Sequence, residues 1–489
     1  MNNALPEKPL HIAGSITVIG ITLARSIHYI SSLFMMAYLG PETIGEFAFS
    51  MFLMLTIYAL LTTGVESRII AIDLKESYLA ESWTIEVLRG ALTFLVILCI
   101  CAYALLNDSL TQVYKYLIVL GIGIFIRSGK NINMVMSRRA LNMLPIFYVE
   151  LGSAICLLLT SLVLVIIYES GWALAFGYLS GSIAYTFLSF KLLPLDGSVL
   201  RFSIIRFREI FSYSKWLMLS AQIVSFFENV VPLIISQIFG SAILGLFERS
   251  DLYTRKIIAQ ITQVFWMVGL PWASRSSRES RNFSEILVLI LLFFVVLAIP
   301  TLVALSIFVP KLLVYVGGLA WSGSEDIVMA LCIVSAIACF NVPFGIVMQA
   351  IKRPNVTLWA GVVKFVSFIL VLILWGRDDI LQFIYALAWA NLFSICFYFI
   401  ASFKIFKMDI FEVIKYIIPM SLPFLLFTYI GYDMVTDLNI FLQLTFSITF
   451  FTFNLVFCFF VVSQKQEVYE IIVNIYQKIL RDLKTKISN

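Results

Sequence analysis

Long apolar stretches separated by short polar connectors recur along the chain. Because about 20 apolar residues are enough for a helix to cross a membrane, the first part of the chain predicts six helices, at 11–39, 43–66, 84–106, 112–137, 144–168 and 171–193. Six more follow a basic connector, at 212–238, 241–272, 285–309, 325–350, 356–376 and 380–403, and the last two lie at 411–432 and 438–463. The pattern predicts an all-α polytopic membrane protein with about fourteen transmembrane helices.

Two segments that lie two hundred residues apart resemble each other. LGPETIGEF begins at Leu39 and FGSAILGLF begins at Phe239, so that the glycines and the phenylalanine correspond in the pairs Gly40 and Gly240, Gly45 and Gly245, and Phe47 and Phe247. In both copies an apolar stretch ends in a glycine and a second apolar stretch begins after a short turn, which is typical of a helical hairpin. The chain is therefore predicted to contain two duplicated six-helix lobes.

The distribution of basic residues predicts the orientation in the membrane. With the N-terminus in the cytoplasm, the cytoplasmic flanks of the predicted helices contain 23 Lys and Arg residues, and the external flanks contain only Lys115, Lys311 and Arg377. Cytoplasmic loops of membrane proteins carry such an excess. An even number of helices places both termini in the cytoplasm, and the six-helix offset makes the two lobes parallel repeats.

The predicted organisation has five parts. They are an N-terminal lobe at 1–196, a cytoplasmic connector at 197–211, a C-terminal lobe at 212–408, helices 13 and 14 at 409–463, and a cytoplasmic amphipathic tail at 464–489. In the tail, apolar residues from Val468 to Leu483 recur at helical spacing with Lys and Arg opposite them. We expect the tail to lie on the inner leaflet, where its basic residues meet anionic lipid.

The composition excludes several classes of protein. With 61% hydrophobic residues, 13% charged residues and a mean hydropathy of +0.98, the chain differs from soluble domains, in which about 25% of residues are charged. The seven cysteines lie in apolar stretches without a nearby His/Cys cluster, so no metal or other cofactor is expected. The predicted external connectors are short and lack catalytic groupings. We therefore expect neither enzymatic activity nor a nucleic-acid partner.

Charged residues inside the predicted helices are the candidates for function, because a charge inside a membrane is costly. Apart from charges near the span ends, which are counted with the flanks, the spans contain eight basic residues, Arg25, Arg127, Lys130, Lys215, Arg249, Arg255, Lys256 and Lys364, and four buried acidic residues, Glu150, Glu228, Glu248 and Asp251. The formal excess of four positive charges suits a water-filled cavity that binds an anion. The candidate cavity cations are Arg25, Arg249, Arg127, Lys130, Arg255 and Lys364, and the candidate ion-coupling groups are Glu228 and Asp251.

Several of these candidates also have a structural interpretation. Lys130 lies near enough to the cytoplasmic side for its side chain to extend into the interface. Asp251 and Arg255 are four residues apart and can neutralise each other on one helix face. Arg25 either lines the cavity or pairs with Glu228. Arg249 has no acidic residue three or four positions away, and we therefore predict that it is unpaired and lines the cavity.

Three stretches resemble the oligosaccharide flippases of the multidrug/oligosaccharidyl-lipid/polysaccharide (MOP) exporter superfamily, the Wzx-type polysaccharide transporters. They are LGPETIGEFAFSMF at 39–52, FGSAILGLFERSDLY at 239–253 and the run from VGGLAW to IKRPN at 316–355. In the last run, Gly317 stands where the family's FG-x-x-W loop has Phe, and Lys352 stands where the family's QA-x-G-R-P ending has Gly. Arg249 matches the family's Arg after an aromatic pair, and Arg25 matches a basic position of the first helix in some members.

This resemblance implies two six-helix lobes, often with two extra helices, and a flippase function. The implied substrate is an undecaprenyl-diphosphate-linked oligosaccharide of O-antigen, capsule or exopolysaccharide, moved across the bacterial inner membrane by alternating access. The other expected partners are membrane lipids, H⁺ or Na⁺ as a coupling ion, and membrane proteins of polysaccharide assembly. Arg25 and Arg249 would hold the diphosphate from opposite lobes, since Arg makes bidentate contacts with phosphate oxygens.

Two other functions remain open at this point. A multidrug cation antiporter of the same superfamily would need an acidic cavity, which the excess of basic residues disfavours. A membrane glycosyltransferase or polysaccharide polymerase would need external loops with catalytic groups, and the predicted external connectors are too short for them.

The fourteen-helix topology makes a testable prediction for reporter fusions. Fusions after Gly40, Asp108, Gly240 and Asp378 should report an external location, and fusions after Arg139, Arg208 and Arg353 should report a cytoplasmic location. An alkaline phosphatase and green fluorescent protein pair measures this in intact cells. Two reversed positions would contradict the topology, because a single miscounted helix inverts every later connector.

Overall fold

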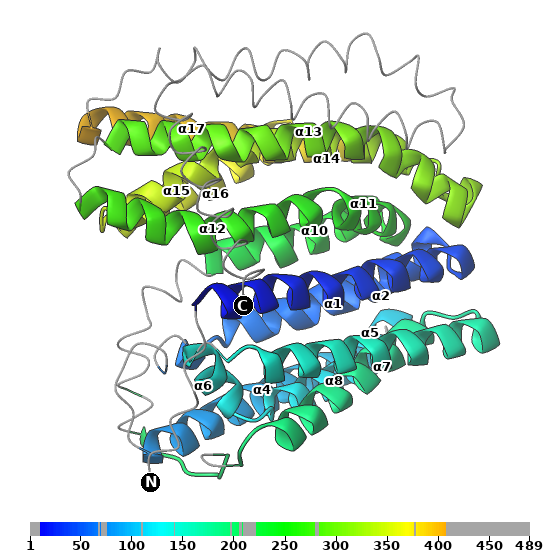
Figure 1. The fold of residues 1–489 in the computed structure, drawn as a ribbon. Helices are drawn as coiled ribbons and strands as arrows, with labels where there is room; N and C mark the ends of the chain where they lie inside the picture. The colour runs from blue at the N-terminus through cyan, green and yellow to red at the C-terminus, as the bar shows by residue number, and fades with distance from the viewer. Residues whose placement is uncertain are drawn as a thin grey trace, which may run out of the picture. The chain divides into compact units, whose positions relative to one another are not determined.

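The computed structural model describes residues 10–66, 69, 76–108, 111–140, 142–195, 198–204, 208, 222–278, 283–375 and 378–406. These residues form helices joined by turns, without a strand among them (Figure 1). They divide into two compact units. Unit 1 holds the described residues up to Arg249 together with Leu313–Gly323, and unit 2 holds the described residues of Ser250–Leu312 and those from Ser324 onward.

Unit 1 is built from helices that surround an apolar core. The helices are α1 (Leu10–Tyr38), α2 (Pro41–Leu60), α4 (Glu76–Leu106), α5 (Gln112–Ser128), α6 (Asn133–Arg139), α7 (Leu144–Tyr168), α8 (Trp172–Leu192), the π-helical turn η1 (Phe226–Val230), α10 (Val231–Phe239) and most of α11 (Ser241–Tyr253). Helix α5 packs against α2, α4 and α8, and α7 packs against α1 and α8. Met54, Ile97, Leu117 and Leu120 are buried at the centre of the α2, α4 and α5 contact.

Unit 2 is also helical. It contains α12 (Arg255–Arg278), most of α13 (Phe283–Gly317), α14 (Ser324–Cys339), α15 (Asn341–Ala350), α16 (Pro354–Leu374) and α17 (Ile380–Phe406). The 3₁₀ turn η2 (Leu319–Trp321), which precedes α14 in the chain, belongs to unit 1. The core of unit 2 includes Leu287, Phe344, Met348 and Tyr398, whose side chains come from α13, α15 and α17.

The described helices confirm the predicted all-α membrane class. Nine of them are long and apolar enough to cross a membrane, and up to ten if the bent pair α5 and α6 counts as one span. The observed bounds of α7, Leu144–Tyr168, agree with the predicted helix at 144–168. The predicted helices at 411–432 and 438–463 and the tail at 464–489 lie outside the described residues, so the count of fourteen stays a prediction.

Several predicted helix bounds are wrong. Helix α2 ends at Leu60 instead of residue 66, before the non-helical residues Thr62–Gly64. The stretch 241–272 is interrupted at Thr254, whose hydroxyl donates a hydrogen bond to the Ser250 carbonyl oxygen at 2.6 Å. The stretch 325–350 is interrupted at Phe340, because Pro343 cannot continue the hydrogen-bond ladder of α14.

The predicted helix at 112–137 is also broken. Helices α5 and α6 are bent by 60° around the residues between Ser128 and Asn133. The Trp83 indole N–H donates to the carbonyl oxygens of Lys130 at 2.9 Å and Gly129 at 3.3 Å. These bonds satisfy backbone groups that would otherwise lack partners in an apolar surrounding.

The Asn131 side chain holds this break in place. Its Nδ2 donates to the Pro194 carbonyl oxygen at 2.8 Å, and its Oδ1 accepts hydrogen bonds from the Asn133 backbone N–H at 2.9 Å and the Ser198 hydroxyl at 3.1 Å. Asn131 thereby connects the bend to the polar segment that follows α8.

The repeated glycines lie against each other. A Cβ atom on Gly45 would lie 1.7 Å from the Ser241 carbonyl oxygen, and a Cβ atom on Gly245 would lie 1.9 Å from the Pro41 carbonyl oxygen. Helices α2 and α11 therefore approach through their backbones at equivalent positions of the repeat. Only glycine permits such an approach.

The two departures from the family motif are accommodated differently. The Trp321 side chain is buried and lies so close to Gly317 that a Cβ atom there would be 2.2 Å from Trp321 Cδ1. A larger residue at position 317 would need a different placement of Trp321. Lys352 adopts a φ of 60°, which is the left-handed conformation that the family's glycine adopts at lower energy.

The glycine contact predicts sensitivity to a single methyl group. Gly45→Ala and Gly245→Ala should each destabilise the protein by about 1–3 kcal/mol, because the added carbon meets backbone that cannot rotate away. The midpoint of thermal unfolding of the purified protein in detergent measures this effect. Gly40→Ala is the matched control, since Gly40 has a φ of −70° and no atom within 4 Å of the new carbon. Equal midpoints for all three variants would rule out the backbone contact.

The role of Asn131 predicts a second stability difference. Asn131→Ala should lower the free energy of unfolding by about 1–3 kcal/mol, since it leaves buried polar partners of the α5 and α6 break unsatisfied. Asn107→Ala is the control, because the exposed Asn107 side chain makes a single local hydrogen bond, to the Tyr103 carbonyl oxygen. The same unfolding experiment compares the two. A loss for Asn131→Ala no larger than for the control would mean that the break is held by other contacts.

Candidate functional site

A cavity of about 470 Å³ lies within unit 1, between the end of α2 and helices α4 to α8. Its charged lining consists of the basic residues Arg89, Arg127, Lys130 and Arg138 and the acidic residues Glu66, Glu86 and Glu150. Tyr58 and Tyr185 contribute aromatic rings. We call this site the cationic cavity, since its lining has one more basic than acidic residue. So many charges within a helical bundle indicate a functional site.

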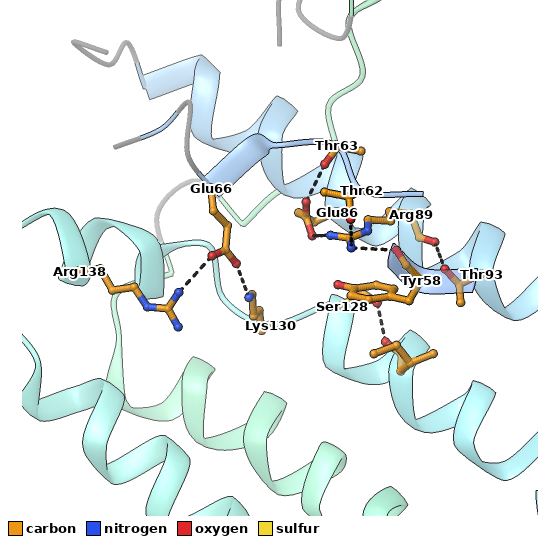
Figure 2. A network of polar contacts seen from close by, with 11 residues as sticks. Tyr58, Thr62, Thr63, Glu66, Glu86, Arg89, Thr93, Ser128, Lys130 and Arg138 are labelled. Carbon is orange, nitrogen blue, oxygen red and sulfur yellow. Dashed lines mark hydrogen bonds and ion pairs between the residues drawn. The ribbon is translucent and has the colours of Figure 1, made fainter. Parts of the chain in front are cut away.

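Lys130 and Arg138 both contact one carboxylate. Lys130 Nζ lies 2.6 Å from Glu66 Oε1, and Arg138 Nη1 lies 3.1 Å from Glu66 Oε2 (Figure 2). Lys130 belongs to the break between α5 and α6, and Arg138 belongs to the last turn of α6. The bend therefore brings the two cations, eight residues apart in sequence, to the same anion.

The surroundings of Glu66 keep its carboxyl group ionised. Burial raises the pKa of Glu66, but the charge and hydrogen bond of Lys130 and the charges of Arg138 and Arg89 lower it by more. The net result is a pKa below the ordinary value of a glutamate. At neutral pH the pair of cations therefore faces a full negative charge.

Arg89 has a different role because its guanidinium group is held by α2. One nitrogen donates to the Tyr58 carbonyl oxygen at 2.9 Å and to the Thr62 hydroxyl at 3.0 Å. The guanidinium carbon lies 3.7 Å from the centroid of the Tyr58 ring, and Glu86 pairs with Arg89 at 3.4 Å. Arg89 thus satisfies the C-terminal end of α2, where a cation is also favoured by the helix dipole (Figure 2).

Arg127 is less tightly held. Its guanidinium carbon lies 3.9 Å from the centroid of the Tyr185 ring, and one nitrogen lies 3.9 Å from Glu150 Oε2. The side chains of Arg127 and Glu150 are each 35% exposed. His28 on α1 lies near enough to interact electrostatically with both. Arg127 is therefore the cation of the lining that can most easily turn toward a ligand.

Two of the six predicted cavity cations, Arg127 and Lys130, line this cavity. Arg25 lies half-buried on α1, and Lys364 lies half-buried on α16 in unit 2. Arg255 forms an ion pair with Asp251, as the spacing of four residues predicts. Glu228 is exposed on the π-helical turn η1. The coupling role of Glu228 and its pairing with Arg25 stay predictions.

The prediction that Arg249 is unpaired is wrong. Arg249 is 6% exposed, and one guanidinium nitrogen donates a hydrogen bond to the Ser32 hydroxyl of α1. Its Nε lies 3.2 Å from Glu248 Oε2, an ion pair whose geometry falls short of a hydrogen bond. A neighbour in sequence and a residue more than two hundred positions away provide these contacts, and neither belongs to the i±3 or i±4 positions that the prediction considered.

The sequence interpretation missed Glu66, Glu86, Arg89 and Arg138. Arg89 and Arg138 were counted as cytoplasmic flanking charges, and that count cannot tell a charge in the interface from one that points into a cavity. One available signal was the spacing of Glu86 and Arg89, three residues apart within an apolar helix. The convergence on Glu66 had no local signal, since its partners are 64 and 72 residues away.

Comparison with known proteins agrees with the fold. The solved lipid II flippase MurJ, in an inward closed conformation, matches with a TM-score of 0.72 and 14% identity over 92% of this chain and 98% of that one. An inward-facing multidrug resistance MATE family transporter of the MOP superfamily matches with a TM-score of 0.57 and 14% identity over 78% and 94%. A variant of the Vibrio cholerae MATE transporter VcmN matches with a TM-score of 0.51 and 12% identity over 81% and 96%.

These likenesses show that the chain shares the fold of these solved transporters, as the sequence motifs predicted. No curated protein matches the chain by sequence. A family profile described as a polysaccharide biosynthesis protein matches residues 35–326, which include the helices that form the cationic cavity. Because this match covers more than half of the chain, the protein belongs to the polysaccharide biosynthesis protein family.

Proposed function

We propose that the protein is a flippase for undecaprenyl-diphosphate-linked oligosaccharide repeat units of O-antigen, capsule or exopolysaccharide. It acts in the bacterial inner membrane by alternating access, with both termini in the cytoplasm. The family and the fold support a transporter, and the chemistry of the cationic cavity supports an anionic headgroup as its substrate.

The observation that carries the proposal is the pair of Lys130 and Arg138 around one carboxylate. A diphosphate diester presents several oxygens and two negative charges, and both Lys and Arg make strong, charge-assisted hydrogen bonds to such oxygens. The Glu66 carboxylate marks where an oxyanion fits. Arg127, held at 3.9 Å by Glu150, stands in the same cavity as a third cation.

The cavity also suits the division of the substrate between two environments. The sugar and diphosphate need a polar, cationic path, whereas the polyprenyl chain stays in lipid. A polar cavity within apolar helices provides such a path at low cost, because the charges of its lining compensate one another.

A multidrug cation antiporter is the second candidate, favoured by the likeness to solved MATE transporters. Its substrate would need carboxylates in the cavity. Glu66, Glu86 and Glu150 are available for that role only if a drug replaces their contacts with Lys130, Arg89 and Arg127. The following experiment separates the two functions.

Removal of either cation of the pair should reduce flipping. Lys130→Ala or Arg138→Ala should lower headgroup affinity by about 10- to 150-fold, because each removes a charge-assisted contact of about 1.5–3 kcal/mol. Complementation of a flippase-null strain, scored by surface polysaccharide at matched membrane abundance, measures the loss.

Lys191→Ala is the matched control, since Lys191 is an exposed lysine in the last turn of α8, outside the cavity lining. The Lys191→Ala variant should keep full flipping activity. Lys130→Arg should retain part of the activity that Lys130→Ala loses. Wild-type levels of surface polysaccharide in both Lys130→Ala and Arg138→Ala would exclude the proposed binding of the headgroup by these two cations. If expression of the wild-type protein in the flippase-null strain increases resistance to cationic dyes without any change in surface polysaccharide, the protein is instead a multidrug cation antiporter.

A further inference from the structure

We infer that Glu66 is a resident competitor that occupies the Lys130 and Arg138 pair whenever no headgroup is bound. It thereby keeps weakly binding anions, such as phospholipid headgroups of single charge, out of the cationic cavity. This inference rests on the proposed function and concerns the same site. It assigns Glu66 a role in specificity rather than in holding the substrate.

The geometry of Glu66 fits that of a bound oxyanion. One carboxylate oxygen contacts Lys130 at 2.6 Å and the other contacts Arg138 at 3.1 Å, so each oxygen serves one cation. Figure 2 shows the carboxylate between the two basic side chains. A phosphate group that binds both cations would place its oxygens where these two oxygens lie. Glu66 and the headgroup therefore cannot occupy the pair together.

The cations are held by the fold, whereas the carboxylate is easier to displace. The backbone of Lys130 is fixed by Trp83 at the break, and Arg138 lies on α6, which begins at the break that Asn131 fixes. Glu66 follows the non-helical residues Thr62–Gly64, in which Gly64 has a φ of 69°. Its side chain remains 35% exposed despite two ion pairs. Rotation of the Glu66 side chain would release the pair without unfolding a helix.

Charge balance explains what the competitor achieves. With Glu66 in place the two cations keep one net positive charge. A ligand with a single negative charge would replace one monoanion by another and gain little, whereas a diphosphate brings a second charge and additional oxygens. Because every anion must displace Glu66, the binding of every anion to the two cations is weakened. Only a ligand of high intrinsic affinity therefore stays bound. The lowered pKa of Glu66 keeps this competitor charged at neutral pH.

The same competition assists release. When the substrate has moved, the carboxylate can return to the cations and reduce the chance that the headgroup binds again. A transporter needs moderate affinity at this step, because a headgroup bound too tightly would delay the cycle. The Glu66 carboxylate limits the affinity for the headgroup, and the cations that recognise the substrate are kept.

The test uses the purified full-length protein in phosphatidylcholine nanodiscs, with inorganic pyrophosphate as the probe. Glu66→Gln should bind pyrophosphate about 10-fold or more tightly than wild type, since it leaves the side-chain shape but removes the competing charge. Glu42→Gln is the matched control, because Glu42 is an exposed acidic residue in the first turn of α2, outside the cavity lining. It should change the dissociation constant by less than about 3-fold.

Addition of phosphatidylglycerol to the nanodiscs examines the exclusion of lipid headgroups. The added lipid should weaken pyrophosphate binding to Glu66→Gln and leave wild type unchanged. Glu66→Asp keeps the charge on a shorter side chain and should give an intermediate affinity, which provides a second measurement if the glutamine variant folds poorly. In a Lys130→Ala background, Glu66→Gln should have much less effect.

The outcomes distinguish the competitor from the binding site itself. If Lys130→Ala weakens pyrophosphate binding but Glu66→Gln binds like wild type or like Glu42→Gln, the competitor role is wrong and the site stands. If neither Lys130→Ala nor Glu66→Gln alters pyrophosphate binding, both the site and the competitor role are wrong. An equal effect of phosphatidylglycerol on wild type and Glu66→Gln would also overturn the exclusion of lipid.

Discussion

A backbone that leaves the helical path inside an apolar bundle must find hydrogen-bond partners within the protein, and the cationic cavity depends on this constraint. The break between α5 and α6 satisfies it through Trp83, which binds the carbonyl oxygens of Gly129 and Lys130, and through Asn131. Because the break is stabilised, Lys130 from the break and Arg138 from α6 can approach one carboxylate. An unbroken helix would carry these side chains along a single axis, about 12 Å apart at 1.5 Å per residue.

The four cations of the cavity are not equivalent, although each would count the same in a tally of charge. Arg89 satisfies the end of α2 and is surrounded by Tyr58, Thr62 and Glu86. Lys130 and Arg138 share one negative charge, and Arg127 lies 3.9 Å from its acidic partner Glu150. A cation that is compensated by helix backbone stabilises the fold, whereas one that shares or barely touches its counter-ion remains able to bind a ligand.

The fold alone does not decide between an exporter of lipid-linked sugars and an exporter of drugs, because flippases and multidrug transporters share it. The repeat also belongs to the fold. The close approach of Gly45 and Gly245 brings equivalent turns of the duplicated hairpins together and requires glycine on both sides. The evidence for substrate class therefore lies in the side chains of the cavity, and chiefly in the convergence of two cations on Glu66.

The sequence by itself determined the helical class, the bounds of helices such as α7, the glycine repeat, the pairing of Asp251 with Arg255, and the resemblance to the MOP superfamily. These features arise from hydropathy over 20 residues and from contacts three or four residues apart, which sequence spacing reveals. Only the tertiary structure decided which polar and charged groups far apart in the sequence meet. Arg249 contacts Ser32 across 217 positions, and Lys130 contacts Glu66 across 64, because helix packing sets these distances and local spacing carries no information about them. The helix break at Gly129–Ile132 was equally hidden, since backbone groups at this bend find polar partners inside the protein that local spacing does not reveal.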